Sequence, residues 1–227
     1  MIKTVIFDLG GTLINTEYFT HTLKGLKKNI EILNSIGLRI SEEEFLKLRE
    51  KIDKILKKDP RRNFPGFYYQ KLFEFKNKKI DLDKAINAEK KYQRALIKNS
   101  ELYPNAKELL SNLLRKGIRL IMITNNSVEE ANLLIDKHKI RNFFNYILIS
   151  EEIGFRKSTK KPFLFIIEKF NLKPNEILMV GDKEEEDVLP AKELGIKTVF
   201  FNLKKKSSIA DYNITDLMDI WWLFFHD

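Results

Sequence analysis

The sequence contains no cysteine and only three histidines. The absence of thiols excludes disulfides, thiolate metal sites and cysteine nucleophiles. The three histidines, His21, His138 and His226, do not have the spacing of metal ligands. A zinc enzyme or a hydrolase with a Ser-His-Asp triad is therefore not expected.

The sequence also lacks an apolar run long enough to span a membrane. Its first residues read as a strand, and not as a basic stretch followed by an apolar run and a cleavage site. We therefore expect a cytoplasmic protein with no membrane partner. At 227 residues, of which 43% are hydrophobic, the chain is long enough to bury a substantial core as one large or two small domains.

Positive charge is in excess in only one segment. Residues 14–98 contain 21 Lys and Arg against 12 Asp and Glu, which accounts for the whole formal net charge of +9. This uneven distribution predicts a separate structural unit, and a basic unit facing a site would attract anionic substrates. The alternative is a solvated, lysine-rich helical surface. No nucleic-acid partner is expected, because no binding motif or dense basic stripe is present.

The basic segment has the pattern of helices. Between Thr16 and Ile36 apolar residues recur at spacings of three and four, which predicts an amphipathic helix that ends at Gly37. Ser41-Glu42-Glu43-Glu44 is a capping box that starts a second helix, expected to reach about Lys58. Two more helices are predicted near residues 67–78 and 82–99.

The rest of the chain alternates between strands and helices. After the first strand at residues 4–7, strands are predicted at 118–123, 146–150, 177–180, 197–201 and 212–214, and helices at 105–116, 128–139, 160–170 and 188–194. This alternation predicts an α/β fold, a Rossmann-like three-layer core with a mostly parallel sheet. Because the helical segment separates the first strand from the others, we expect a core of residues 1–14 and 100–227 with an inserted all-helical domain of residues 15–99.

Three predicted strands end in polar residues, namely Asp8, Thr124 and Asp182. The carboxyl ends of strands in a doubly wound sheet meet in one crevice. Asp8 and Asp182 could supply the carboxylates that Mg²⁺ prefers, and the acidic run Asp182–Asp187 adds more. Lys157 could lie beside this cluster, where it would keep Asp8 ionised and neutralise a bound phosphoryl group.

With these residues the chain resembles the haloacid dehalogenase superfamily of aspartate-nucleophile hydrolases over essentially its whole length. The four family motifs are matched in order by Asp8-Leu9-Gly10-Gly11-Thr12, by Ile121-Met122-Ile123-Thr124, by Lys157 within Gly154-Phe155-Arg156-Lys157, and by Gly181-Asp182 through Asp187. Lys161, which precedes Pro162, is the first alternative for the lysine of the third motif, and Lys160 is the second.

The resemblance implies a phosphatase in which Asp8 attacks the phosphorus of a small anionic phosphorylated substrate and forms an aspartyl-phosphate that water hydrolyses. It implies Mg²⁺ as the cofactor. The groups expected to hold the ion are Asp8, the backbone carbonyl of Gly10, Asp182 and Asp187, the last through water unless it braces the lysine instead. The residues expected to contact the phosphoryl group are Leu9, Gly10, Thr124, Asn125 and Lys157, with Thr124 and Lys157 also stabilising the transition-state charge.

Gly10 departs from the family pattern. Most phosphatases of the family have Asp at this position, where it protonates the leaving group and later activates water. Three alternatives remain open. The substrate has a good leaving group, another residue among Glu17, Tyr18 and His21 supplies the proton, or the protein is a catalytically weakened phosphate-binding module. A phosphonatase is a further alternative, whereas Asp182 and Asp187 argue against a haloacid dehalogenase.

The inserted domain resembles the helical cap of the family, which selects the substrate. The residues considered for substrate contacts are Arg61, Arg62, Phe64, Phe67, Tyr68 and Tyr69, although Phe67 and Tyr68 also fit a role in the core of this domain. The aromatic run Trp221–Phe225 is predicted to be a helix end that docks on the core, with an oligomer contact as the alternative. The sequence does not decide between a monomer and a homodimer.

Overall fold

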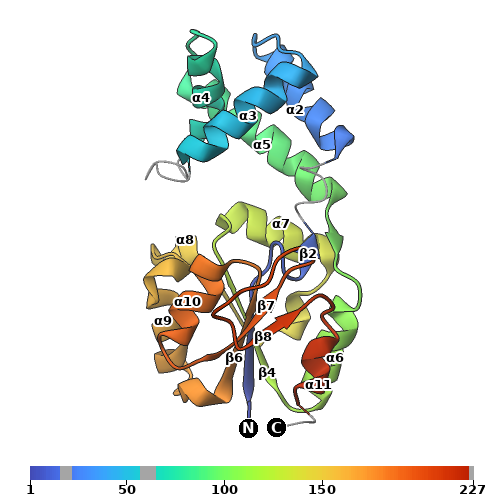
Figure 1. Cartoon of the computed structure of the whole chain (residues 1–227), viewed down its shortest axis with the longest axis vertical. Helices are drawn as coiled ribbons and strands as arrows, with labels where there is room; N and C mark the ends of the chain where they lie inside the picture. The colour runs from blue at the N-terminus through green and yellow to red at the C-terminus, as the bar shows by residue number, and fades with distance from the viewer. Residues whose placement is uncertain (16–21, 57–64, 225–227) are drawn as a thin grey trace. The chain divides into compact units, whose positions relative to one another are not determined.

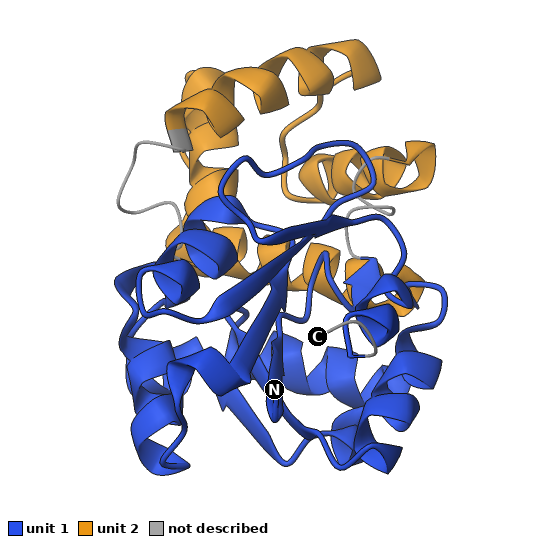
Figure 2. Cartoon of the chain, turned by 60° about the horizontal axis from the view of Figure 1, so that its bottom comes forward, with its two compact units in different colours: residues 1–16, 101–227 blue, residues 17–100 orange. Residues whose placement is uncertain are grey.

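The structure is a computed structural model that describes residues 1–15, 22–56 and 65–224. The chain divides into two compact units (Figure 2). Unit 1 consists of residues 1–16 and 101–227, and unit 2 consists of residues 17–100.

Unit 1 is built on a parallel sheet in the order β5-β4-β1-β6-β7-β8. Its strands are β1 (Thr4–Phe7), β4 (Arg119–Thr124), β5 (Tyr146–Ile149), β6 (Ile177–Gly181), β7 (Lys197–Phe201) and β8 (Tyr212–Ile214). All four residues of β1 are buried, because the strand is central and both faces of the sheet are covered. The predicted Rossmann-like α/β core is confirmed.

Helices cover both faces of this sheet. They are α6 (Ala106–Arg115), α7 (Val128–His138), α8 (Ser150–Ile153), α9 (Lys161–Lys169), α10 (Leu189–Lys192) and α11 (Asp219–Trp222). Figure 1 shows α9 and α10 on one side of the sheet and α6 and α11 on the other. Ile6 and Met179 of the sheet pack with Phe163 of α9 in one buried cluster. Burying a side chain of this size contributes about 1.5–3 kcal/mol.

Short irregular segments complete unit 1. 3₁₀ turns lie at Arg141–Phe143, Lys157–Thr159 and Pro174–Glu176. A two-stranded antiparallel ribbon pairs β2 (Ile14–Asn15) with β3 (Glu101–Leu102). The sequence does not reveal this ribbon, since two residues are too few to show an alternating pattern.

The acidic run after β6 differs from its prediction. The predicted single helix over residues 188–194 is wrong. Instead, Glu184–Val188 forms a π-helical turn, and the shorter helix α10 follows it and ends at Lys192. The carbonyl of Lys183 accepts hydrogen bonds from the N–H groups of Asp187 at 2.8 Å and of Val188 at 3.4 Å. This widened turn buries Glu186 and Asp187, which the sequence alone presents as part of a solvated loop.

The described residues of unit 2 form helices and the segments that connect them. It contains α2 (Leu23–Ser35), α3 (Glu42–Leu56), α4 (Phe67–Phe75) and α5 (Leu82–Asn99). The hydroxyl of Ser41 accepts a hydrogen bond from the N–H of Glu44 at 3.2 Å, as the capping box requires. Tyr69 lies in the buried core of the unit, where its hydroxyl donates to Asn29 Oδ1 at 2.8 Å. The part of the first predicted helix before Thr22 lies outside the described residues.

Of the proposed substrate contacts in unit 2, Arg61, Arg62 and Phe64 lie outside the described residues. Phe67 is 7% exposed and Tyr68 packs against the core of the unit, so both have the surroundings of core residues.

The aromatic run near residue 221 begins within α11, whose Ile220 is fully buried. The ammonium group of Lys116, which follows α6, lies 5.4 Å from the ring centroid of Trp221. Helix α11 packs against α6, as a docked helix end would, whereas Trp222 is 58% exposed and Phe225 lies outside the described residues. None of the helices in residues 1–15, 22–56 and 65–224 combines the length and apolarity that crossing a membrane requires.

Candidate active site

Asp8 follows β1 directly and stands at the carboxyl end of the central strand. Its backbone N–H donates to the carbonyl of Val180 in β6 at 2.9 Å, and its side chain accepts from Thr12 Oγ1 at 3.3 Å. The residue is only 6% exposed. Gly11, with φ of 90°, gives the chain its turn here, and a Cβ at this position would lie 2.3 Å from Asp182 Oδ2. The glycine thus lets the backbone approach a carboxylate closely.

Lys157 brings a positive charge to Asp8. It starts the 3₁₀ turn Lys157–Thr159, and its backbone N–H donates to Asn125 Oδ1 at 3.1 Å. Its ammonium group forms ion pairs with Asp8 and with Asp187 Oδ1, the latter at 2.5 Å. Burial alone would lower the pKa of Lys157, but the attraction of Asp187 and Asp8 outweighs burial and holds the pKa above its usual value.

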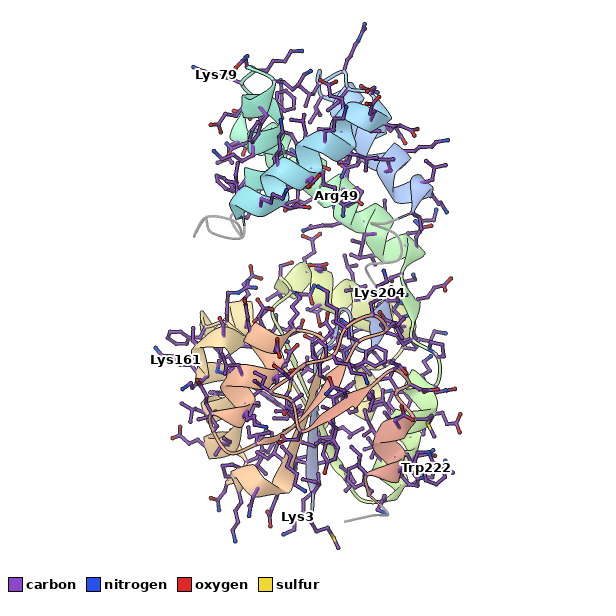
Figure 3. The ribbon with its side chains drawn as sticks, viewed as in Figure 1. Lys3, Arg49, Lys79, Lys161, Lys204 and Trp222 are labelled. Atoms are coloured by element: carbon purple, nitrogen blue, oxygen red, sulfur yellow. The ribbon has the colours of Figure 1, made fainter. Side chains whose placement is uncertain are left out.

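The two alternative lysines do not reach this group. Lys161 is exposed and its ammonium group lies 3.6 Å from the ring centroid of Phe155 (Figure 3 shows it at the outer surface of unit 1). Lys160 pairs instead with Glu193 at 2.6 Å. The structure therefore brings Lys157, and neither alternative, into contact with Asp8.

Asp8, Asp182 and Asp187 form a cluster of carboxylates. One oxygen from each lies within 4.8 Å of the others, and Asp182 Oδ1 is buried without a hydrogen-bond partner among the described residues. Burial, followed by the charges of Asp8 and Asp187, raises the pKa of Asp182 to about 8. Burial likewise raises the pKa of Asp187, to about 6, although Lys157 opposes the shift.

This cluster fits a hard divalent cation. The three carboxylates outnumber the two neighbouring lysines, Lys157 and Lys183, and oxygen donors are the ligands that Mg²⁺ prefers. Gly181 lets Asp187 approach, because a Cβ at Gly181 would lie 2.3 Å from the Asp187 side chain. Gly10 is half-buried just before the Gly11 turn, and its carbonyl stays a predicted ligand.

Thr124 and Asn125 follow the neighbouring strand β4. The Thr124 hydroxyl donates to Asn126 Oδ1 at 2.5 Å, so a contact to a phosphoryl oxygen would replace that bond. Asn125 Oδ1 accepts from Ser150 Oγ at 2.8 Å as well as from the Lys157 N–H. Asn125 thereby ties the end of β4 to the turn that carries Lys157.

Sequence reasoning did not single out several residues of this site. Thr12 closes the first motif, but no role was predicted for it. Arg156 and Glu186 each precede a residue that was predicted, and nothing in the pattern predicts that they pair. Asn126 and Ser150 have no sequence signal beyond their position after a strand. The three candidates for the missing proton donor, Glu17, Tyr18 and His21, lie outside the described residues.

The raised pKa values predict how stability depends on pH and on Mg²⁺. Asp182 and Asp187 have folded-state pKa values of about 8 and about 6, above the ordinary value of 3.8, so their contribution to stability is present below pH 4 and is lost as pH rises toward 8. We expect Mg²⁺ to raise the free energy of unfolding more at pH 8 than at pH 5, because the ion binds the ionised cluster. Urea unfolding at both pH values, with EDTA or Mg²⁺, measures this. An equal effect of Mg²⁺ at the two pH values would contradict it.

Comparison with known proteins gives relatives across the chain. Residues 2–195 match the family model described as haloacid dehalogenase-like hydrolase. The chain is 29% identical over 227 residues to the glyceraldehyde 3-phosphate phosphatase of Methanocaldococcus jannaschii, covering 97% of this chain and 96% of that protein. It is 23% identical over 215 residues to the ribulose-1,5-bisphosphate 5-phosphatase of Halopiger xanaduensis, covering 93% and 89%.

A solved structure shares the fold. The magnesium-bound HAD hydrolase YfnB of Bacillus subtilis superposes with a TM-score of 0.81 at 20% identity, over 99% of each chain.

Proposed function

The chain belongs to the haloacid dehalogenase-like hydrolases, and from this we propose that it is a Mg²⁺-dependent phosphatase that hydrolyses a small phosphorylated metabolite through Asp8. The observation that carries the proposal is the placement of Asp8. Asp8 lies nearly buried at the end of the central strand, where it pairs with Lys157 and forms a carboxylate cluster with Asp182 and Asp187 that fits a cation. The family resemblance seen in the motifs is confirmed by the family match over residues 2–195.

The proposed reaction has two displacements at phosphorus. An Asp8 carboxylate oxygen forms a bond to phosphorus as the ester oxygen leaves with the bonding electron pair. Water then attacks the aspartyl-phosphate, which releases inorganic phosphate and restores the carboxylate. Lys157 pairs with the Asp8 carboxylate and offers positive charge to the phosphoryl oxygens. Mg²⁺, when bound by Asp8, Asp182 and the Gly10 carbonyl, would neutralise phosphoryl charge, with Asp187 bracing Lys157.

The substrate proposal follows from the relatives. Two of them are named as phosphatases of glyceraldehyde 3-phosphate and of ribulose-1,5-bisphosphate, which are small phosphorylated sugars. We extend this substrate class to the present chain. Unit 2, inserted in the chain between the first and second motifs, corresponds in this proposal to the substrate-selecting cap of the family.

Phosphate release from a panel of sugar phosphates, aryl phosphates and acyl phosphates tests the proposal. We expect turnover with Mg²⁺ and its loss with EDTA. An absence of turnover on every compound, together with measurable binding of inorganic phosphate, would instead support the phosphate-binding alternative that Gly10 raises.

The glycine at position 10 leads to a separate prediction of how turnover depends on the leaving group. Because glycine offers no acid, we expect wild-type kcat/KM, which reports the step in which the leaving group departs, to be much higher for para-nitrophenyl phosphate than for an alkyl phosphate. Gly10→Asp is expected to raise kcat for the alkyl phosphate by roughly tenfold or more, since a general acid contributes about 10²–10⁴ in well-formed sites. Gly10→Asn, which has the same size but no acidic proton, is the control.

Equal wild-type kcat/KM values for the two substrates would contradict this prediction. Such a result would show that another residue already supplies the proton.

A further inference from the structure

A second ion pair lies directly beside the pair that holds the lysine. Lys157 meets Asp187 at 2.5 Å, and the residues that precede each of them, Arg156 and Glu186, meet at 2.9 Å between Nη2 and Oε1. Two loops that are far apart in the sequence are thus joined by two consecutive bridges. One loop leads into the 3₁₀ turn Lys157–Thr159, and the other is the π-helical turn after β6.

The outer bridge is more buried than an ordinary surface ion pair. The side chain of Glu186 is 12% exposed and that of Arg156 is 37% exposed. Glu186 Oε2 also lies 3.6 Å from the ammonium group of Lys183, so this carboxylate faces two cations. A buried carboxylate needs such partners, and breaking one of them leaves an uncompensated charge.

Arg156 reaches Glu186 through Nη2, while its Nε is buried with no hydrogen-bond partner among the described residues. The bond to Glu186 thus anchors the guanidinium. The Arg156–Glu186 bridge holds the two backbone segments together. It therefore limits how far the adjacent Lys157 and Asp187 can move apart.

We propose that Arg156 and Glu186 are positioning residues that keep the Lys157 ammonium group between Asp8 and Asp187. Both act on Lys157 and Asp187 through the chain, because each directly precedes one of them, and Glu186 also lies beside Asn125, one of the predicted phosphoryl contacts. The kinetic consequence rests on the proposed phosphatase function, because small displacements of a group that stabilises the transition state cost large factors in rate.

The test compares R156M, R156K, E186Q and the double variant R156M/E186Q. We expect R156M and E186Q each to lower kcat roughly tenfold with KM within about twofold, and R156K to retain most activity. The double variant should be no slower than the slower single variant, because each substitution alone already removes the same Arg156–Glu186 bridge. In ¹³C-lysine-labelled protein, the ¹³Cε resonance of Lys157, assigned with K157M, should shift in R156M and E186Q.

A matched control lies nearby. Lys160 and Glu193 form a bridge at 2.6 Å between the end of the same 3₁₀ turn and the end of α10, and both side chains are more than 40% exposed. K160M and E193Q should leave kcat and the Lys157 resonance unchanged.

The resonance of Lys157 decides the proposal without any substrate, so a failure of the phosphatase proposal does not affect it. An unchanged resonance in R156M and E186Q would overturn the positioning role. Additive losses in kcat, or equal losses in the control variants, would overturn it as well.

Discussion

Asp8→Asn is expected to lower turnover by roughly 10⁴-fold or more, because an amide cannot attack phosphorus as a carboxylate does. The fold should tolerate this change. The variant keeps the shape of a nearly buried side chain and removes one of three clustered negative charges, while Asp187 still pairs with Lys157. We therefore expect the melting temperature to stay level or to rise, as is common when a charged catalytic group is neutralised. Phosphate release and thermal unfolding of the same sample measure the two effects.

Asp136→Asn is the matched control, since Asp136 is 65% exposed and pairs with Arg141 on the surface. It should leave turnover unchanged. Substantial residual activity in Asp8→Asn would rule out the aspartyl-phosphate route while leaving the family assignment intact.

Lys157→Met is expected to damage both stability and turnover. The substitution leaves the fully buried Asp187 and the nearly buried Asp8 without their cation. Breaking a buried ion pair on one side costs about 3–5 kcal/mol. Because Lys157 opposes the raised pKa of Asp187, this pKa should rise further in the folded variant, so the loss should be small at pH 5 and grow as pH rises to 7.5. Urea unfolding at these two pH values measures it.

Lys161→Met makes the same chemical change at the surface, where only the contact with the Phe155 ring is lost. Such an exposed cation–π contact contributes about 0.5–1 kcal/mol. The prediction for Lys157 would fail if Lys161→Met destabilised the protein as much, or if the loss in Lys157→Met did not depend on pH.

The elements that the sequence predicts well are those with a strong local signal. Helix α5 at residues 82–99 and strand β7 at 197–201 have the predicted bounds, since their periodicity is sustained and Asp81 caps the helix. Strand β1 is equally clear, because a continuous apolar run followed by a glycine turn is typical of a buried parallel strand.

The details of the site depend on contacts that sequence patterns do not encode. Glu184, Glu185 and Glu186 are chemically identical, and only the π-helical turn decides that Glu186 is the buried one. Its partner Arg156 lies 30 residues earlier in the chain. The motifs pointed to Lys157, but its simultaneous contact with Asp8 and Asp187 depends on the tertiary fold.

The central position of β1 has a consequence for how the chain folds as it is synthesised. Its neighbours in the sheet are residues 119–122 and 177–180, so β1 leaves the ribosome long before either of them. Unit 2, made of residues 17–100, is contiguous in sequence and is complete much earlier. The apolar strand β1, which precedes Asp8, therefore stays unpaired while the inserted helices form. Nascent chains cut off before residue 177 would expose this strand and be the ones that most need a chaperone.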